Sequence, residues 1–224
     1  MRGRRTEGWR IAAFAAACLL LLATAVTPLE ALSYHLLSMH LLQNVILAEW
    51  APALLVLAVP PSLAERIGIV PGVRQLTRPP VALGLWLLTY FVWHLPPAYD
   101  TALEHPATLL HLEHVCYLAA GSLLWWPVFQ DAPQRLSNAS KALYLFLAFL
   151  LASPVGLLLA LAPEPAYDYY VDGGGLWGLG VHADQQIAGV TMAVEQSIVF
   201  FAVFAVYFFR FLGDEERAAA PRAE

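Results

Sequence analysis

The sequence predicts an all-α polytopic membrane protein, a bundle of about six transmembrane helices with both termini in the cytoplasm. Of the 224 residues, 59% are hydrophobic and 13% are charged, and the mean hydropathy is +0.61. A soluble domain carries about 25% charged residues. The surplus apolar residues form runs of about 20, the length that crosses a bilayer. A soluble single-core fold and a disordered chain are therefore excluded.

Six apolar stretches define the expected spans, and prolines lie at several of their ends, as expected for helix-breaking residues. The stretches are Ile11–Leu29, Leu36–Val59, Val81–Leu95, Thr108–Phe129, Ala142–Ala162 and Gln185–Leu212. Residues 1–10 would form a cytoplasmic N-terminus, residues 11–212 one bundle domain, and residues 213–224 a polar cytoplasmic tail. Ala23-Thr24-Ala25 also permits a competing interpretation of residues 1–25 as a cleaved signal peptide, which would leave five spans.

The basic residues set the expected orientation, because cytoplasmic loops carry an excess of Lys and Arg. All of them fall before span one, between spans two and three, between spans four and five, or after span six: Arg2, Arg4, Arg5, Arg10, Arg66, Arg74, Arg78, Arg135, Lys141, Arg210, Arg217 and Arg222. The alternate loops contain none. We therefore expect both termini on the cytoplasmic side.

The histidines gather on the opposite side, in outer loops or in the outer third of a span. They are His35, His40, His94, His105, His111, His114 and His182. The same side carries acids without a basic residue to offset them: Glu30, Asp100, Glu104, Glu164, Asp168, Asp172 and Asp184. Such a surface attracts cations through its field. The pattern predicts an extracytoplasmic, acidic rim that is rich in imidazole.

A metal site is the expected use of this rim. His111 and His114 lie three residues apart at the start of a helix, so both imidazoles can reach one ion. His94, His40 and Asp184 lie at similar depths and complete the set of expected ligands. Further candidates are Glu113, His182, Met39, Met192 and Cys116. Imidazole suits copper, zinc, iron or nickel, and the sulfur ligands would favour copper(I).

Several of these residues have a structural alternative. A histidine at a membrane rim often serves as a hydrogen-bonding interfacial group, which is the favoured interpretation of His35 and His105. Glu113 is about 100° or more around the helix from both neighbouring histidines. It is therefore better explained as a partner to another helix than as a ligand. Cys116 fits a buried apolar position.

Two acids are expected near the middle of the membrane. Glu49 lies nine residues after His40 and Glu195 eleven residues after Asp184, so each is roughly 14–16 Å below the rim at about 1.5 Å per residue. An intramembrane carboxylate indicates an ion or proton path by default. The alternative is a protonated side chain held by a hydrogen bond.

The ordered motifs resemble those of the CtaG-type bacterial cytochrome c oxidase assembly factors. The strongest begins Trp93-His94-Leu-Pro96-Pro-Ala-Tyr99-Asp100 and continues with His111-Leu-Glu113-His114; the others are Met39-His40-Leu-Leu-Gln43 and Asp184-Gln185-Gln186-Ile-Ala-Gly189-Val-Thr-Met192. Together they cover about residues 38–210. The chain departs from the family pattern at Asn44, where many members have His, at Glu49 and Glu195, and in having six rather than seven spans.

The resemblance implies a non-enzymatic role in the bacterial inner membrane. The chain would bind copper, as Cu(I), and aid its insertion into the copper B centre of cytochrome c oxidase subunit I, with extracytoplasmic copper chaperones and membrane lipid as further partners. Nucleic acid is not an expected partner at a net charge of −5. The alternatives are a b-type haem protein, a copper or proton permease, and a metal-free scaffold that docks the oxidase.

Overall fold

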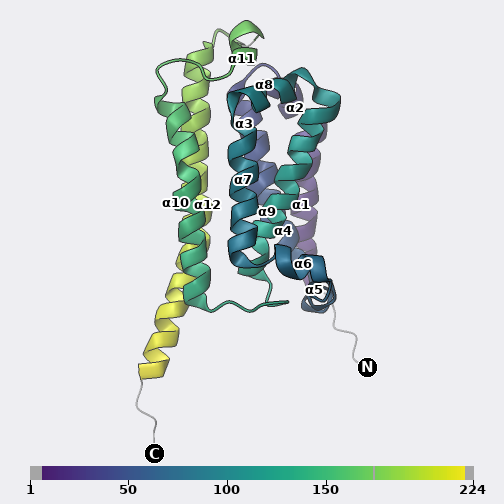
Figure 1. The fold of residues 1–224 in the computed structure, drawn as a ribbon, viewed down its shortest axis with the longest axis vertical. Coiled ribbons are helices and arrows are strands. Elements are labelled where there is room, and N and C mark those ends of the chain that lie inside the picture. The colour runs from purple at the N-terminus through teal and green to yellow at the C-terminus, as the bar shows by residue number, and fades with distance from the viewer. Residues whose placement is uncertain (1–6, 174, 220–224) are drawn as a thin grey trace, which may run out of the picture.

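The computed structural model describes residues 7–173 and 175–219, and these form an almost entirely helical bundle (Figure 1). The elements in chain order are α1 (Gly8–Val26), α2 (Pro28–Ser33), α3 (Leu37–Val45), the π-helical turn η1 (Ile46–Trp50), α4 (Ala51–Ala58), α5 (Pro61–Gly68), α6 (Pro71–Leu76), α7 (Pro79–Trp93), α8 (Pro96–Glu104), η2 (Pro106–Leu110), α9 (His111–Phe129), α10 (Asn138–Leu161), α11 (Asp168–Gly173) and α12 (Val181–Ala219).

Five helical segments are long and apolar enough to cross a membrane: Gly8–Val26, Leu37–Ala58, Pro106–Phe129, Asn138–Leu161 and Val181–Ala219. The expected third span is a bent pair, in which α7 and α8 meet at 72°. The predicted all-α membrane fold is therefore confirmed, with five spans or six if the bent pair counts as one. The orientation of the termini in the membrane stays a prediction.

Two expected span ends differ from the helix ends in the structure. The first span ends at Val26 rather than Leu29, because Thr27 is extended and accepts a hydrogen bond from the amide of Leu29, which starts α2. The last helix runs past Leu212 to Ala219, and an Arg217–Asp214 ion pair of 2.7 Å joins neighbouring turns there. The polar tail is thus a continuation of α12 as far as Ala219; residues 220–224 lie outside the described part, as does the start of the N-terminal segment.

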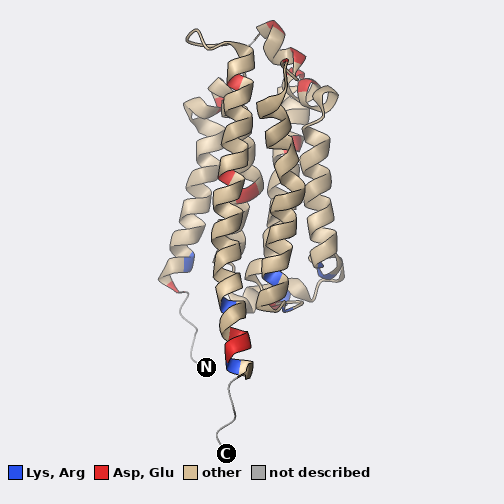
Figure 2. Ribbon diagram, turned by 90° about the vertical axis from the view of Figure 1, so that its left-hand side faces the viewer, with Lys and Arg blue, Asp and Glu red and all other residues tan. Residues whose placement is uncertain are grey.

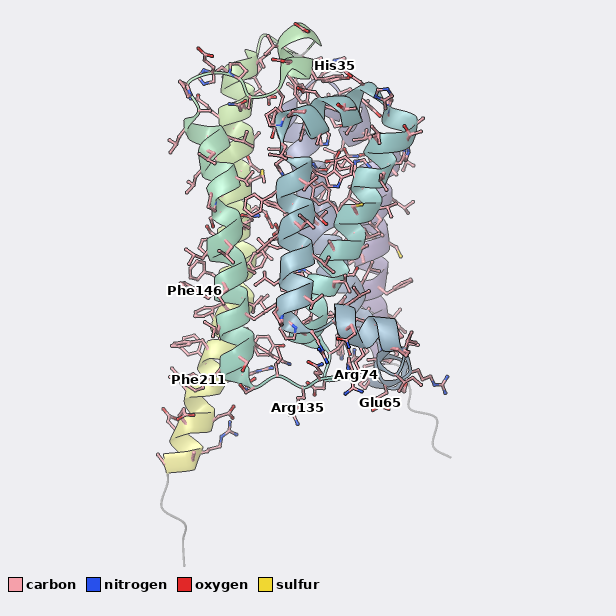
Figure 3. The ribbon with its side chains drawn as sticks, viewed as in Figure 1. His35, Glu65, Arg74, Arg135, Phe146 and Phe211 are labelled. Atoms are coloured by element: carbon pink, nitrogen blue, oxygen red, sulfur yellow. The ribbon has the colours of Figure 1, made fainter. Side chains whose placement is uncertain are left out.

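Charge divides the bundle into two ends (Figures 2 and 3). Arg74 and Arg135 lie at one end, here called the basic end, where α1 begins and α12 ends. His35 lies at the other, here called the histidine end, beside α2, α8 and α11. In the described part of the chain Lys and Arg lie at the basic end, as the sequence predicts, whereas Asp and Glu occur at both ends and inside the bundle.

The first span is fastened to the second at two levels. At the basic end, the Arg10 guanidinium donates to the carbonyl oxygens of Leu57 and Val59, at 2.8 and 2.7 Å. Nearer the histidine end, Gln43 Nε2 donates to the carbonyl oxygen of Thr24 at 2.8 Å. A chain cleaved near residue 25 would lose these bonds.

Helices α10 and α12 form a tightly packed hairpin beside the other spans (Figure 1). Their backbones meet at Gly156 and Gly189. A Cβ atom on Gly189 would lie 2.4 Å from the amide nitrogen of Ala160 and 2.5 Å from the carbonyl oxygen of Gly156. Small residues at such a crossing let membrane helices approach closely.

An acid from α12 supplies the N-terminal cap that α3 lacks. Leu36 at the N-cap position makes no side-chain cap bond. Instead the Asp184 carboxylate accepts from the amide of Leu37 at 2.6 Å and from the amide and hydroxyl of Ser38. A carboxylate at a helix N-terminus satisfies free amides and interacts favourably with the helix dipole. Asp184 therefore holds α12 to the start of α3.

Replacing Gly189 by Ala should destabilise the hairpin by about 1–3 kcal/mol, because the new methyl group overlaps backbone atoms that cannot move aside. We expect a lower thermal unfolding midpoint in detergent. Gly84→Ala in α7 is the matched control, since a Cβ there meets nothing within 4 Å. Equal midpoints for the two variants would contradict the close contact.

Replacing Asp184 by Ala should cost roughly 0.5–2 kcal/mol, the usual effect of losing a helix cap. Hydrogen exchange at the amides of Leu37 and Ser38 should quicken, while Asp184→Asn, which keeps one acceptor oxygen, should fall between. Glu164→Ala is the control, because its side chain is exposed at the same end. Unchanged exchange at both amides in Asp184→Ala would rule out the cap.

Candidate functional site

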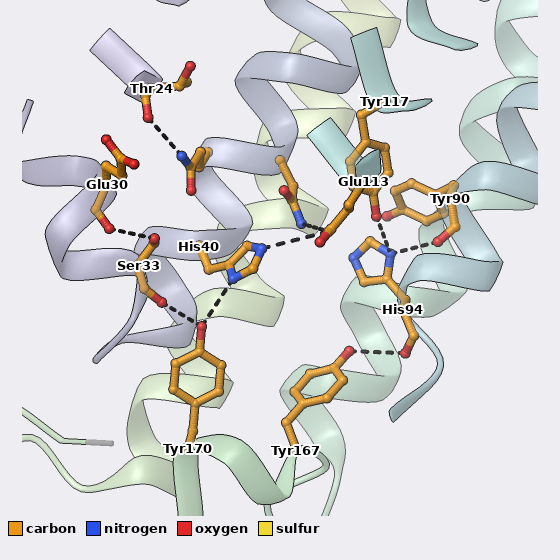
Figure 4. A network of polar contacts seen from close by, with 12 residues as sticks. Thr24, Glu30, Ser33, His40, Tyr90, His94, Glu113, Tyr117, Tyr167 and Tyr170 are labelled. Carbon is orange, nitrogen blue, oxygen red and sulfur yellow. Dashed lines mark hydrogen bonds and ion pairs between the residues drawn. The ribbon is translucent and has the colours of Figure 1, made fainter. Parts of the chain in front are cut away.

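A buried polar group lies between α3, α7 and α9 near the histidine end (Figure 4). It comprises His40 from α3, His94 at the end of α7, and Glu113 and His114 from the first turn of α9; these four residues are called the histidine cluster below. His40 and Glu113 have no exposed surface, and His94 is 8% exposed. The cluster therefore brings together three of the predicted ligands and one further candidate.

The contacts of His40 fix the proton on its ring. The Tyr170 hydroxyl donates to the carbonyl oxygen of Ser33 at 2.6 Å, so its oxygen is free to accept from His40 Nδ1, 3.2 Å away. In the neutral ring, Nε2 then carries the lone pair. That atom lies 3.7 Å from Glu113 Oε1. With a neutral ring, two electron-pair donors thus face one another at a fully buried contact.

Glu113 is held by a neighbour on span two. Asn44 Nδ2 donates to Glu113 Oε1 at 2.9 Å, while Glu113 Oε2 has no hydrogen-bond partner in the described part of the chain. Glu113 points inward, away from the exposed ring of His111. This geometry agrees with its expected role as a partner to another helix.

His94 is oriented in a similar way. Its Nδ1 donates to the carbonyl oxygen of Tyr90 at 2.7 Å, and the Tyr117 hydroxyl lies 3.2 Å from the same nitrogen. Because a carbonyl oxygen can only accept, Nδ1 carries the proton and Nε2 the lone pair. The Tyr167 hydroxyl donates to the His94 carbonyl oxygen at 3.1 Å and fixes the end of α7.

The Nε2 atoms of His40, His94 and His114 share one property. All three are buried, and none has a hydrogen-bond partner within residues 7–173 and 175–219. Tyr99 packs against two of the rings, with centroids 4.8 Å from His40 and 6.3 Å from His94. The His40 and His114 centroids are 6.5 Å apart. Three imidazole nitrogens are thus available near one another.

The other expected ligands lie elsewhere. His111 is exposed, its Nδ1 donates to the carbonyl oxygen of Pro106 at 2.6 Å, and its ring centroid is 6.5 Å from that of His114. His182 Nε2 donates to the carbonyl oxygen of Ala162 at 2.9 Å. Asp184 caps α3. Met39 and Cys116 are half-buried, and Met192 is buried beside a small cavity below His94.

No three His, Cys, Asp or Glu side chains in the described ranges lie close enough to hold one metal ion. The buried Nε2 atoms have the donor chemistry for a metal but not the spacing of a closed site. The predicted metal ligands therefore stay predictions.

The two expected intramembrane acids meet across the bundle. Glu49 in η1 has no exposed surface, and Gln196 Nε2 donates to its Oε1 at 2.9 Å and to the Tyr90 hydroxyl at 3.0 Å. Trp50 Nε1 donates to Glu195 Oε1. The carboxyl groups of Glu49 and Glu195 lie within hydrogen-bonding reach of each other.

Two surface hollows adjoin these groups. An acidic pocket of about 480 Å³ opens at the histidine end, lined by Tyr34, His35, Asp100, Glu104, Asp168, Tyr169, Asp172 and Gly173. Burial raises the pKa of Tyr34 and of Tyr169, so both hydroxyls stay neutral at this pocket. A second, apolar groove of about 820 Å³ runs between α7 and α10, and His94 lies in its wall. We call it the lateral groove.

Sequence reasoning missed the groups that support these sites. From the sequence, Asn44 is only a departure from the expected family pattern, and Tyr99 and Gln196 have no predicted role. The signals were present: Asn44 follows His40 by four residues, which places both on one helix face, and Gln196 adjoins an intramembrane acid.

Comparison with known proteins shows which family the chain belongs to. Two curated mycobacterial proteins, each described as uncharacterized, one from Mycobacterium bovis and one from Mycobacterium tuberculosis, are 24% identical to the chain over 215 residues. The match covers 83% of this chain and 32% of each relative, so the chain spans about a third of their length. No solved structure matches. Residues 1–214 match the family described as cytochrome c oxidase caa3 assembly factor, Caa3_CtaG, and the chain belongs to that family.

Proposed function

We propose that this assembly factor carries copper(I) as cargo in the histidine cluster and presents it to subunit I of the oxidase for the copper B centre. One observation carries the proposal: three imidazole Nε2 atoms, from three different spans, are buried without partners in the described structure beside the carboxyl group of Glu113. Nitrogen atoms of this kind are ligands that copper accepts.

Charge balance also supports a monovalent cation here. A buried charge is costly unless it is paired. Imidazole and carboxyl groups bind metals in their deprotonated forms, so three imidazoles and one carboxylate would together present one negative charge to a bound ion. A copper(I) ion compensates that charge and separates the electron pairs of His40 Nε2 and Glu113 Oε1, which lie 3.7 Å apart.

Exchange of the cargo requires ligands that are not locked in place. Since no closed site is present among the described residues, capture requires movements that bring His40, His94 and His114 closer together. The exposed His111 adjoins His114 and serves as the entry ligand, and the acidic pocket raises the local concentration of cations at this end. Asp184 contributes by holding α3, which carries His40, rather than by binding the ion.

The lateral groove supports a route to the oxidase. Its wall contains His94 and is otherwise formed by apolar residues of α7 and α10 and the turn after α10. Apolar helices of membrane proteins associate through such packing surfaces. A transmembrane helix of subunit I docked in the groove would lie next to one ligand of the cluster.

His94→Gln and His114→Gln should each weaken copper(I) affinity by at least about tenfold, since losing even a group that supports a ligand has this effect. Competition with a copper(I) chelator measures it on purified protein. His105→Gln is the matched control, because His105 is exposed at the same end. Cells with the two cluster variants should also assemble oxidase with less copper B.

Two results would contradict this function. If the wild-type protein binds no copper(I), copper is not its cargo, and the chain would then be a metal-free docking scaffold. An equal loss of affinity in the His105→Gln control would show that binding is a general property of the rim.

A photo-crosslinking residue at Leu158 should attach to subunit I in cells that assemble the oxidase. Leu158 is 70% exposed and lines the lateral groove. The control position is Val115 on α9, which is 63% exposed and outside the groove. Equal capture from both positions, or none from Leu158, would mean that subunit I docks elsewhere.

A further inference from the structure

A second buried acidic group lies deeper in the membrane than the histidine cluster. It consists of Glu49 from η1 and Glu195 from α12, called the carboxyl pair below. Glu49 has no exposed surface, Glu195 is 7% exposed, and the two groups are within hydrogen-bonding reach. Segments about 150 positions apart in the chain therefore meet at two acids.

The donors around the pair are too few for two carboxylates. Gln196 Nε2 and Trp50 Nε1 each donate to one oxygen, Oε1 of Glu49 and Oε1 of Glu195 respectively. The Oε2 atom of each acid, and Gln196 Oε1 beside them, are buried and receive no donor from the part of the protein that the structure describes. The pair therefore lacks a hydrogen-bond donor and has acceptors in excess.

No basic side chain in the described ranges compensates the pair. Of the helices packed around it, α1 and α10 carry Arg10 and Lys141, and both act at the basic end, on the carbonyls of α4 and on Asp131. The titratable groups that face the pair are Tyr90 of α7, through Gln196, and His94 and Tyr117 across a small cavity. Two adjacent negative charges here would be strongly unfavourable.

We propose that Glu49 and Glu195 together bind one proton. One residue is a neutral carboxylic acid whose hydroxyl donates to the carboxylate of the other, so the pair carries a single negative charge rather than two. This proton site goes beyond the copper role and does not depend on it, because no member of the histidine cluster belongs to it.

The small cavity supplies a route for proton exchange. About 10 Å³ is available there to the centre of a water molecule, which is room for about one water. Glu49, Asn44, His94 and Tyr117 are among its lining residues. Glu49 Oε2, Asn44 Oδ1 and His94 Nε2 are buried acceptors without a donor among the described residues, and one water could donate to two of them. A water in this cavity would let the shared proton exchange on the side of the pair that faces His94.

The local backbone fits a functional site. Glu49 lies in a π-helical turn inside the second span, and such turns occur frequently where a helix carries function. The hydrogen bond made by the shared proton also links α12 to this turn. If the proton leaves, two carboxylates oppose each other across the contact between α12 and span two.

Infrared spectroscopy of the full chain in lipid nanodiscs tests the site. At neutral pH the wild type should show a carbonyl band of a protonated carboxyl group, which shifts in D2O because the proton exchanges. Glu49→Gln and Glu195→Gln should each remove or displace that band, since either change destroys the shared hydrogen bond. Glu164→Gln, at an exposed acid, should leave it unchanged.

Each variant is first checked by circular dichroism and gel filtration, and having two variants guards against a folding failure in one. A band that is altered in both pair variants and retained in the control supports the proposal. A wild type without the band overturns it, as does a band altered in only one pair variant or in neither. Sodium-dependent carboxylate bands in place of the carbonyl band would also overturn it, by assigning the site to a metal cation.

Discussion

The polar side chains of the second span hold this bundle together, because a group buried among apolar helices has only other helices to satisfy it. Gln43 bonds to α1, Asn44 to Glu113 of α9, and Glu49 to Gln196 of α12. The start of the same span is capped by Asp184. These bonds link span two to α1, α9 and α12 at different levels of the bundle. The histidine cluster and the carboxyl pair are both built on it.

The sequence predicted the membrane fold and the acidic, imidazole-rich end, because span length and charge segregation are local properties. It did not predict which side chains contact one another across the bundle. Asp184 was expected to bind metal, yet it caps α3, and a bond between residues 147 apart cannot be derived from spacing. His111 and His114 are neighbours as expected. The packing of α9 against the other helices, which spacing does not reveal, leaves the His111 ring exposed and turns His114 inward.

Asn44, Glu49 and Glu195 stood out in the sequence, and in the structure each of them contacts another helix. Asn44 donates to Glu113. The side chain of span two next to the histidine cluster is thus an amide. Glu49 and Glu195 meet each other. An acid at either position alone would lack this partner, so the pair is best understood as one feature of the chain.

The polar residues of α12 have a consequence for how the protein is made. A helix with Asp184, Gln185, Glu195 and Gln196 partitions poorly into lipid by itself, since an acid near the centre of a lone helix costs about 2.5–3.5 kcal/mol on insertion scales. These groups find their partners on α3, η1 and the segments flanking α11. Biogenesis therefore favours an order in which the earlier spans are already in the bilayer when the ribosome delivers α12.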